Sequence, residues 1–152
     1  PKWAPAIAPR MEAFEQFVSD YQPEFHMTEA SVFNHTQRYA GTLDSIATLD
    51  GRTVVLDAKS GKGVYPEVGL QLAAYRFAEF VALPDGSDKP MPATDGAVAL
   101  NLSDGGGYVL HDVRADEEVF QAFLFVREVF KFTEVTAKTI LTPYVKREAV
   151  PV

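Results

Sequence analysis

The chain contains no cysteine. It can therefore build neither disulfides nor thiolate metal sites, and this composition fits a reducing compartment. No apolar run approaches the ~20 residues that a membrane-spanning helix needs, and no signal-peptide pattern is present. We therefore expect a cytoplasmic, soluble protein.

Several catalytic signatures are also missing. The sequence has no G-x-S-x-G elbow, no H-E-x-x-H pair and no glycine-rich dinucleotide fingerprint, so serine hydrolase, zinc protease and Rossmann oxidoreductase readings lack support. The turn 60–63 is not a phosphate-binding loop, because that motif needs glycine where Leu56 stands and serine or threonine where Gly63 stands. The three scattered histidines fit structural or exposed roles better than metal ligation.

Positive charge is scarce, with 14 lysines and arginines against 21 aspartates and glutamates, a net charge of −7. Sequence-independent DNA binding depends on neutralising phosphates with basic side chains. Any nucleic-acid binding should therefore be weak, salt-sensitive and local to a small basic patch, or supported by a partner subunit. The candidates for that patch are Arg38, Lys59, Lys62, Lys2 and Arg10.

At 152 residues the chain is long enough for one domain with a real core. Periodicity and turn signals predict an α/β fold, a central mixed sheet flanked by helices. We expect strands at 25–34, 39–49, 53–59, 97–102 and 108–113, with helices at 10–21, from Pro66 to about Val81, and after Asp116. Residues 1–9 should form an arm or linker, 84–95 a loop, and 141–152 an irregular tail.

Two expectations concern the helices. Leu70, Ala73, Ala74, Phe77 and Val81 recur as one apolar stripe, which should be the core face of the helix that opens at Pro66. The last helix is heavily apolar, so it should cover one sheet face and bury its phenylalanines. Its apolar residues are Val119, Phe120, Phe123, Leu124, Val126 and Phe130.

The strand 53–59 has apolar residues on both faces, which indicates a central position in the sheet. Because side chains alternate along a strand, Asp57 and Lys59 share a face, about 6–7 Å apart. Asp50-Gly51 is a hairpin signal that joins the preceding strand antiparallel. That connection should bring Asp44 beside Asp57.

Two ionised carboxylates about 4 Å apart repel by about 4 kcal/mol at an effective dielectric near 20. Either a cation offsets this repulsion or one carboxyl stays protonated. Lys59 supplies one positive charge, and two converging hard oxygen ligands also suit Mg²⁺ or Mn²⁺. Such an ion activates water and stabilises charge on a phosphate, which makes this a candidate site for phosphodiester hydrolysis.

The three segments Gly41-Thr42-Leu43-Asp44, Asp57-Ala58-Lys59 and Gln71 to Tyr75 together resemble the PD-(D/E)XK nuclease superfamily, within it the RecB-like and Cas4-like exonucleases often encoded by phages. The resemblance covers about a quarter of the chain. It implies a restriction-endonuclease-like core and activity in a bacterial or phage-infected cell. Its implied roles are metal ligation by Asp44, Asp57 and the Ala58 carbonyl, and activation of water by Lys59. Gln71 and Tyr75 should face DNA, with Lys62 and Arg38 as further DNA contacts.

The chain departs from this family in two ways. Iron–sulfur members need cysteines, which are absent here, and many RecB-like members take a ligand, often histidine, from an upstream helix, whereas 1–21 contains none. Glu29, in the strand before Asp44, is a candidate to complete the metal shell. Alternatively, Glu29 is an exposed edge-strand acid or a partner of Arg38. Glu67 is a further candidate, reaching the metal through water.

We therefore expect a Mg²⁺- or Mn²⁺-dependent DNA nuclease, an exonuclease by its resemblance, that works as a homo-oligomer or with a partner recombination or replication protein. Two alternatives stay open. One is a non-catalytic nucleic-acid-binding or assembly module with the same fold, and the other is a phosphoesterase acting on something other than DNA.

Overall fold

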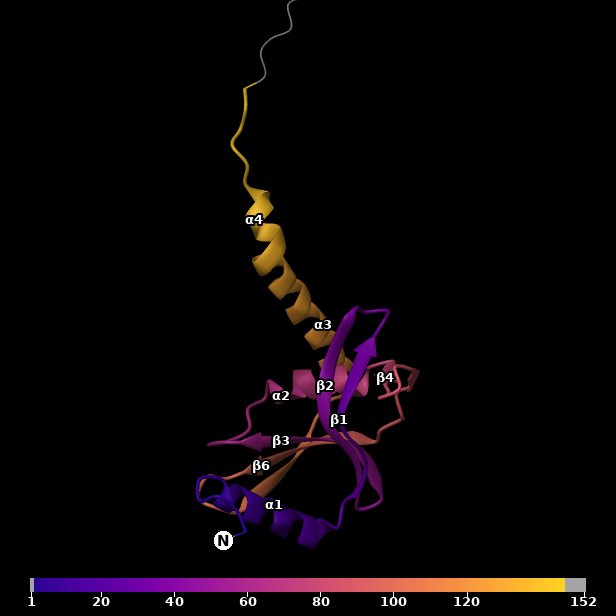
Figure 1. Cartoon of the computed structure of the whole chain (residues 1–152). Helices are drawn as coiled ribbons and strands as arrows, with labels where there is room; N and C mark the ends of the chain where they lie inside the picture. The colour runs from indigo at the N-terminus through magenta and orange to yellow at the C-terminus, as the bar shows by residue number, and fades with distance from the viewer. Residues whose placement is uncertain (1, 147–152) are drawn as a thin grey trace, which may run out of the picture.

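A computed structural model describes residues 2–146, and Figure 1 shows its layered arrangement. Helix α1 lies on one side of a mixed sheet and α2 on the other, and the last helix leaves the body of the domain. The helices are α1 (Ala8–Tyr21), α2 (Val68–Arg76), α3 (Glu117–Lys131) and α4 (Ala137–Ile140), with a π-helical turn at Phe132–Thr136 between the last two. The strands are β1 (Glu24–Asn34), β2 (Tyr39–Leu49), β3 (Arg52–Ser60), β4 (Phe80–Ala82), β5 (Asp88–Pro90), β6 (Gly96–Leu102) and β7 (Tyr108–Val113).

The seven strands form one sheet in the order β5-β4-β1-β2-β3-β6-β7. Within residues 2–146, β3 and β6 are the only parallel pair, and every other neighbouring pair is antiparallel. The crossover between the parallel strands contains α2, so this helix is placed over the sheet beside β3. The predicted α/β fold class is thus confirmed, and so is the interior position of β3.

The hairpin between β2 and β3 turns at Asp50 and Gly51, whose φ angles are 47° and 77°. Positive φ at both central residues is the type I′ geometry that suits the twist of antiparallel strands. Each of the five strands expected from the sequence is present within one residue of its predicted bounds. Helix α1 begins two residues earlier than predicted, with Pro9 in its first turn.

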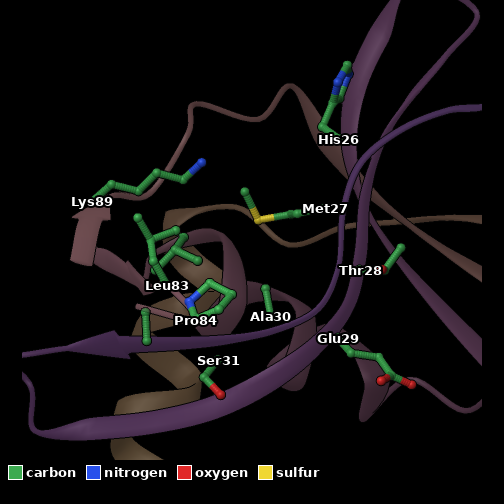
Figure 2. A pocket seen from close by; sticks show the side chains of 11 residues that line it. His26, Met27, Thr28, Glu29, Ala30, Ser31, Leu83, Pro84 and Lys89 are labelled. Atoms are coloured by element: carbon green, nitrogen blue, oxygen red, sulfur yellow. The ribbon is translucent and has the colours of Figure 1, made fainter. Parts of the chain in front are cut away.

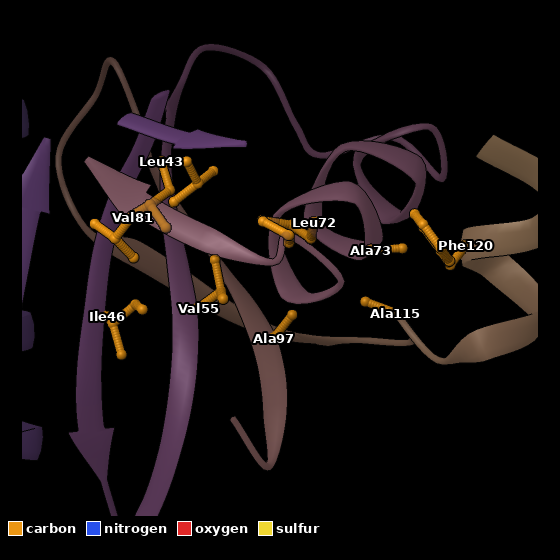
Figure 3. Close-up of a cluster of buried hydrophobic side chains, with 11 residues drawn as sticks. Leu43, Ile46, Val55, Leu72, Ala73, Val81, Ala97, Ala115 and Phe120 are labelled. Atoms are coloured by element: carbon orange, nitrogen blue, oxygen red, sulfur yellow. The ribbon is translucent and has the colours of Figure 1, made fainter. Parts of the chain in front are cut away.

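Two hydrophobic clusters lie on opposite sides of the sheet. Leu56 and Val98 pack toward α1, where Phe17 is fully buried. Val55 and Ala97 face the other side, and Figure 3 shows their side chains with Leu72 of α2. Side chains alternate along β3, so Val54 and Leu56 lie on the α1 face and Val55 and Asp57 on the α2 face, as predicted.

The predicted helix from Pro66 to about Val81 is wrong in its last five residues, because α2 ends at Arg76 and Val81 lies in β4. Asn34 explains the early end: its side-chain nitrogen donates to the Phe77 carbonyl at 2.8 Å. The chain then turns so that Phe80 and Val81 pair with β1. The buried stripe of α2 is Gly69, Leu72, Ala73 and Ala74, and the predicted loop 84–95 contains β5.

The expectation that the last helix covers a sheet face is also wrong. Only its first turns pack on the domain, where Phe120 is 6% exposed and stacks on Phe77. Farther along, Phe125 and Phe130 are 71% and 65% exposed, and the helix projects away from the sheet (Figure 1). Helical spacing marks an apolar face, but it does not say how far the sheet extends beneath it.

Residues 141–146 of the predicted tail have no regular structure, and the rest of that tail lies outside the described residues. Within the described part of the chain, no helix has the length and apolarity required to cross a bilayer.

Candidate functional site at the fork between β2 and β3

Strands β2 and β3 separate beyond Ser45, and the predicted metal ligands Asp44, Asp57 and Ala58 lie at this fork. The two strands pair from Leu49–Arg52 to Ser45–Leu56. Farther on, β2 pairs only with β1, and β3 pairs only with β6. The Ala58 N–H does not continue the ladder to a β2 carbonyl but donates to Asp44 Oδ2 at 2.8 Å. Asp44 therefore bridges the strands where their backbones part.

Asp57 and Lys59 lie together on the α2 face of β3, as the strand alternation predicts. The ammonium Nζ of Lys59 is 2.8 Å from Asp57 Oδ2. The Asp57 side chain is 4% exposed and that of Lys59 is 36% exposed. The pair thus joins a buried carboxylate to a cation that reaches solvent.

Two side chains of helix α2 hold this lysine in place. Lys59 Nζ donates to Gln71 Oε1 at 3.0 Å, and Gln71 Nε2 donates to the Tyr75 hydroxyl at 3.1 Å. Gln71 and Tyr75 are four residues apart, so they share a helix face. A continuous chain of polar contacts therefore runs from Asp57 through Lys59 and Gln71 to Tyr75.

Several contacts fix α2 over the fork. The Tyr39 hydroxyl donates to the Ala74 carbonyl at 2.7 Å, and burial raises the pKa of this phenol to about 12, so it stays a donor. Arg76 donates to the Thr94 and Ala115 carbonyls at 2.7 and 2.8 Å. The helix is thus anchored to the segments before β6 and after β7.

The electrostatics of Asp57 favour a cation. Burial raises the pKa of this carboxyl, Lys59 opposes the rise, and the charge of Asp44 adds to it. Apart from the Lys59 ion pair, the buried Oδ2 has no hydrogen-bond partner within the described chain. An ionised carboxylate in such a place is costly unless positive charge lies close by.

The oxygen atoms at the fork suit Mg²⁺ or Mn²⁺, which accept one or two carboxylates with water completing the shell. Asp44 and Asp57 supply two carboxylates, and Ala58, which follows Asp57 along β3, has a backbone carbonyl of its own. The structure does not add a third acid: no cluster of three or more His, Cys, Asp or Glu suited to one ion occurs in residues 2–146. The donor set therefore fits an ion that keeps several waters.

Glu29 is not gathered with Asp44 and Asp57 into such a cluster. Its neighbours Thr28 and Ala30 pair with Ser45 and Leu43, so Glu29 lies on β1 alongside the fork. Its φ is 47°, a left-handed conformation that a non-glycine residue adopts only when its surroundings impose it. The ligand role predicted for Glu29 from the sequence is to be tested by the Mn²⁺ affinity of Glu29 variants.

The remaining basic candidates are dispersed. Lys62 is exposed in the loop after β3, and Arg38 lies in the turn between β1 and β2 with a φ of 57°. Arg10 pairs with Asp104, and Lys2 pairs with Glu15. Acidic partners thus already engage two members of the proposed basic patch.

A hollow of about 260 Å³ opens beside the polar chain. Its walls include Lys59 and Gln71 together with Tyr65 and Glu67 from the loop and turn before α2. Tyr65 is 67% exposed, so its ring is available to a ligand. This hollow is the solvent access to the Lys59–Gln71 contact.

A second hollow, of about 530 Å³, lies between β1 and the β4–β5 hairpin. Figure 2 shows Met27, Leu83 and Pro84 around it, while the Glu29 carboxylate points away from them. None of Asp44, Asp57 and Lys59 lines this hollow, although its wall includes Glu29 of β1.

Two further residues contribute to the site in ways that were not predicted from the sequence. Gly41 makes room for Tyr75, since a Cβ at this glycine would lie 2.9 Å from Tyr75 Cε1. Asn101 on β6 pairs in register with Lys59 and is 6% exposed. The signal for Asn101 was a lone polar residue in an apolar strand, at even spacing from Ala97 and Ala99.

In comparisons with known proteins, no family model matches this chain and no curated protein matches it.

Proposed function

We propose that this chain is a metal-dependent DNA nuclease that hydrolyses phosphodiester bonds with activated water. The observation that carries the proposal is the polar chain at the β2–β3 fork, where buried Asp57 contacts Lys59 and Lys59 contacts Gln71. The resemblance of these motifs to PD-(D/E)XK nucleases supports the same reaction and, within it, an exonuclease.

The metal ligands would be the Asp44 and Asp57 carboxylates, with the Ala58 carbonyl as a third oxygen. A bound Mg²⁺ or Mn²⁺ supplies charge stabilisation and lowers the pKa of a coordinated water. Asp57 suits this role because its carboxylate is buried, with the Lys59 ammonium as its cationic partner. Asp44 is oriented by the Ala58 N–H, which holds one carboxylate oxygen and leaves the other free of that bond.

Lys59 places an ammonium beside the reacting centre. Its position is set by Gln71, which is itself held by Tyr75. From there the ammonium orients the attacking water or stabilises negative charge on the phosphate. Gln71 and Tyr75 belong to helix α2, which Arg76 anchors to the segment before β6 and the segment after β7. Lys59 is therefore positioned before substrate arrives.

The hollow next to Lys59 provides a route for the substrate strand. Tyr65 offers an exposed ring on which a base can stack, a contact that accepts any base. Glu67 in the same wall disfavours a phosphate there, so the backbone should pass on the Lys59 side. With a net charge of −7, DNA affinity should be low and fall with salt, unless a partner protein or further copies of the chain contribute.

A digestion assay tests the proposal. End-labelled linear DNA and circular DNA are incubated with the protein in Mn²⁺, in Mg²⁺ and in excess chelator. Cleavage that requires metal and is abolished in Asp57→Asn and Lys59→Met, with both variants folded by circular dichroism, would support it. Metal-independent cleavage, or full activity in Asp57→Asn, would overturn the assignment, and resistance of circular DNA would identify an exonuclease.

A non-catalytic nucleic-acid-binding or assembly module is the second candidate. The acidic net charge and the lack of a third acid in the described part of the site favour it. Calorimetry with Mn²⁺ separates the two candidates, since a nuclease should show a saturable site that is lost in Asp44→Asn and Asp57→Asn. A scaffold should show no such site.

A further inference from the structure

Asn101 is a buried polar residue that the proposed reaction does not yet use. It is 6% exposed, and its side-chain Oδ1 has no hydrogen-bond donor within the described chain. The four preceding residues of β6 are apolar and buried. A buried acceptor without a donor destabilises a fold, so an apolar side chain would serve packing better.

Its place in the sheet puts Asn101 beside the site. Strands β3 and β6 are parallel, with Lys59 paired to Asn101. Ala97 belongs to the cluster on the α2 face and Val98 to the cluster on the α1 face. Alternation therefore puts Asn101 on the α2 face, one strand away from Lys59, and adjacent strands are only about 5 Å apart.

The Lys59 ammonium has one N–H that neither Asp57 nor Gln71 engages, and metal binding would remove Asp57 as its partner. Its ammonium carries three N–H bonds, of which Asp57 Oδ2 and Gln71 Oε1 engage two. If Asp57 ligates a divalent cation, that cation and the ammonium compete for the same carboxylate and repel each other. Lys59 then needs another acceptor within reach of its side chain.

We propose that Asn101 Oδ1 is the acceptor to which the Lys59 ammonium turns when Asp57 binds a divalent cation. This inference rests on the proposed function, because it requires metal binding at Asp57. Asn101 is thus a positioning residue: it keeps the ammonium at the reacting centre after its ion pair with Asp57 is broken. Asn101 Oδ1, which lacks a donor in the metal-free protein, is thus the acceptor for Lys59 in the metal-bound protein.

Two variants test the proposal by metal affinity. Asn101→Leu replaces the amide with an apolar side chain of similar size, and Asn101→Asp keeps an acceptor in place. We expect Asn101→Leu to unfold at a higher temperature without metal, because it removes an unsatisfied acceptor. It should also bind Mg²⁺ about 10-fold more weakly, the lower end of the cost of losing an outer-shell residue, because the Lys59 ammonium then keeps competing with the ion for Asp57. Asn101→Asp should restore the affinity.

A spectroscopic test follows the amide itself. In labelled protein, the Asn101 side-chain amide signals should shift on addition of diamagnetic Mg²⁺. The shift should be absent in Lys59→Met, which retains both aspartates as ligands. Wild-type metal affinity in Asn101→Leu, or the same amide shift in Lys59→Met, would overturn the inference. Failure of the wild type to bind Mg²⁺ or Mn²⁺ would instead remove the proposed function with it.

Discussion

Gly41 and Tyr75 are complementary in shape across β2 and α2, because a Cβ on Gly41 would lie 2.9 Å from the Tyr75 ring. That distance is shorter than a normal carbon–carbon contact. The Tyr75 hydroxyl accepts from Gln71, which in turn accepts from Lys59. The glycine therefore determines where the lysine ammonium is held.

Gly41→Ala should displace the Tyr75 ring and loosen Lys59. We expect a loss of about 100-fold in cleavage rate, as a misplacement near 1 Å can cause, and overpacking that costs about 1–3 kcal/mol of stability. Gly105→Ala is the matched control, since a Cβ there meets no atom within 4 Å. Single-turnover cleavage and urea unfolding measure both effects, and equal rates for the two variants would contradict the role of Gly41.

Asp57→Asn should make the metal-free protein more stable at neutral pH. Burial raises the pKa of Asp57 in the fold, so ionising this carboxyl costs stability above its folded pKa. As pH falls below about 4, the ordinary value for aspartate, the carboxyl is protonated in both states and the cost disappears.

Thermal unfolding across pH should therefore show a higher unfolding temperature for Asp57→Asn than for the wild type near pH 7, and this difference should disappear in acid. Asp88→Asn, which changes an exposed carboxylate on β5, is the control. If Asp57→Asn instead unfolds at a lower temperature than the wild type near pH 7, and this deficit disappears in acid, ionised Asp57 stabilises the fold through Lys59.

Glu29 should be replaceable by residues that accept a left-handed backbone. We expect Glu29→Gly and Glu29→Asn to match or exceed the wild type in stability, since a strained φ at a non-glycine residue costs about 1–3 kcal/mol. Glu29→Val should be destabilising because β-branched residues tolerate this conformation least.

The same variants separate the effect of the left-handed backbone at Glu29 from the effect of its carboxylate on metal binding. Because Glu29 is not clustered with Asp44 and Asp57, Glu29→Asn should keep the Mn²⁺ affinity of the wild type. A loss of Mn²⁺ binding in a stable Glu29→Asn protein would instead make Glu29 a ligand.

Phe120 and Phe130, ten positions apart on one chain segment, should respond very differently to truncation. Phe120→Ala should cost about 3–5 kcal/mol because it empties a packed position. Phe130→Ala should stay within about 0.5 kcal/mol, since its ring is 65% exposed. Denaturant unfolding of both variants checks the contrast, and a large cost at Phe130 would indicate that this ring is covered in solution.

The sequence predicts the strands and the fork well for a physical reason. Alternation along β3, the Asp50-Gly51 turn and the opposed position of Asp44 are local patterns, so they determine register without reference to the rest of the chain. Asn101 is different, because its partnership with Lys59 depends on which strand β6 joins and in which direction.

Local sequence patterns also could not predict where α2 ends or that most of α3 is exposed. The helix periodicity continues past Arg76, but Asn34, distant in sequence, captures the Phe77 carbonyl. Likewise the apolar spacing of α3 continues through Phe130 although the sheet does not extend beneath it. The strain at Glu29 leaves no compositional signal, since glutamate is an unusual choice for a positive φ.

The single parallel pairing of the sheet has a kinetic consequence. The β2–β3 hairpin closes a two-residue turn and can form early, bringing Asp44 and Asp57 close. Strand β6 must close a much longer loop, because the register joins Val54 to Gly96, and such closure is slow to nucleate. In the folding chain, Asp44 and Asp57 can therefore approach each other before β6 docks, and Asn101 comes to lie beside Lys59 only when the crossover closes.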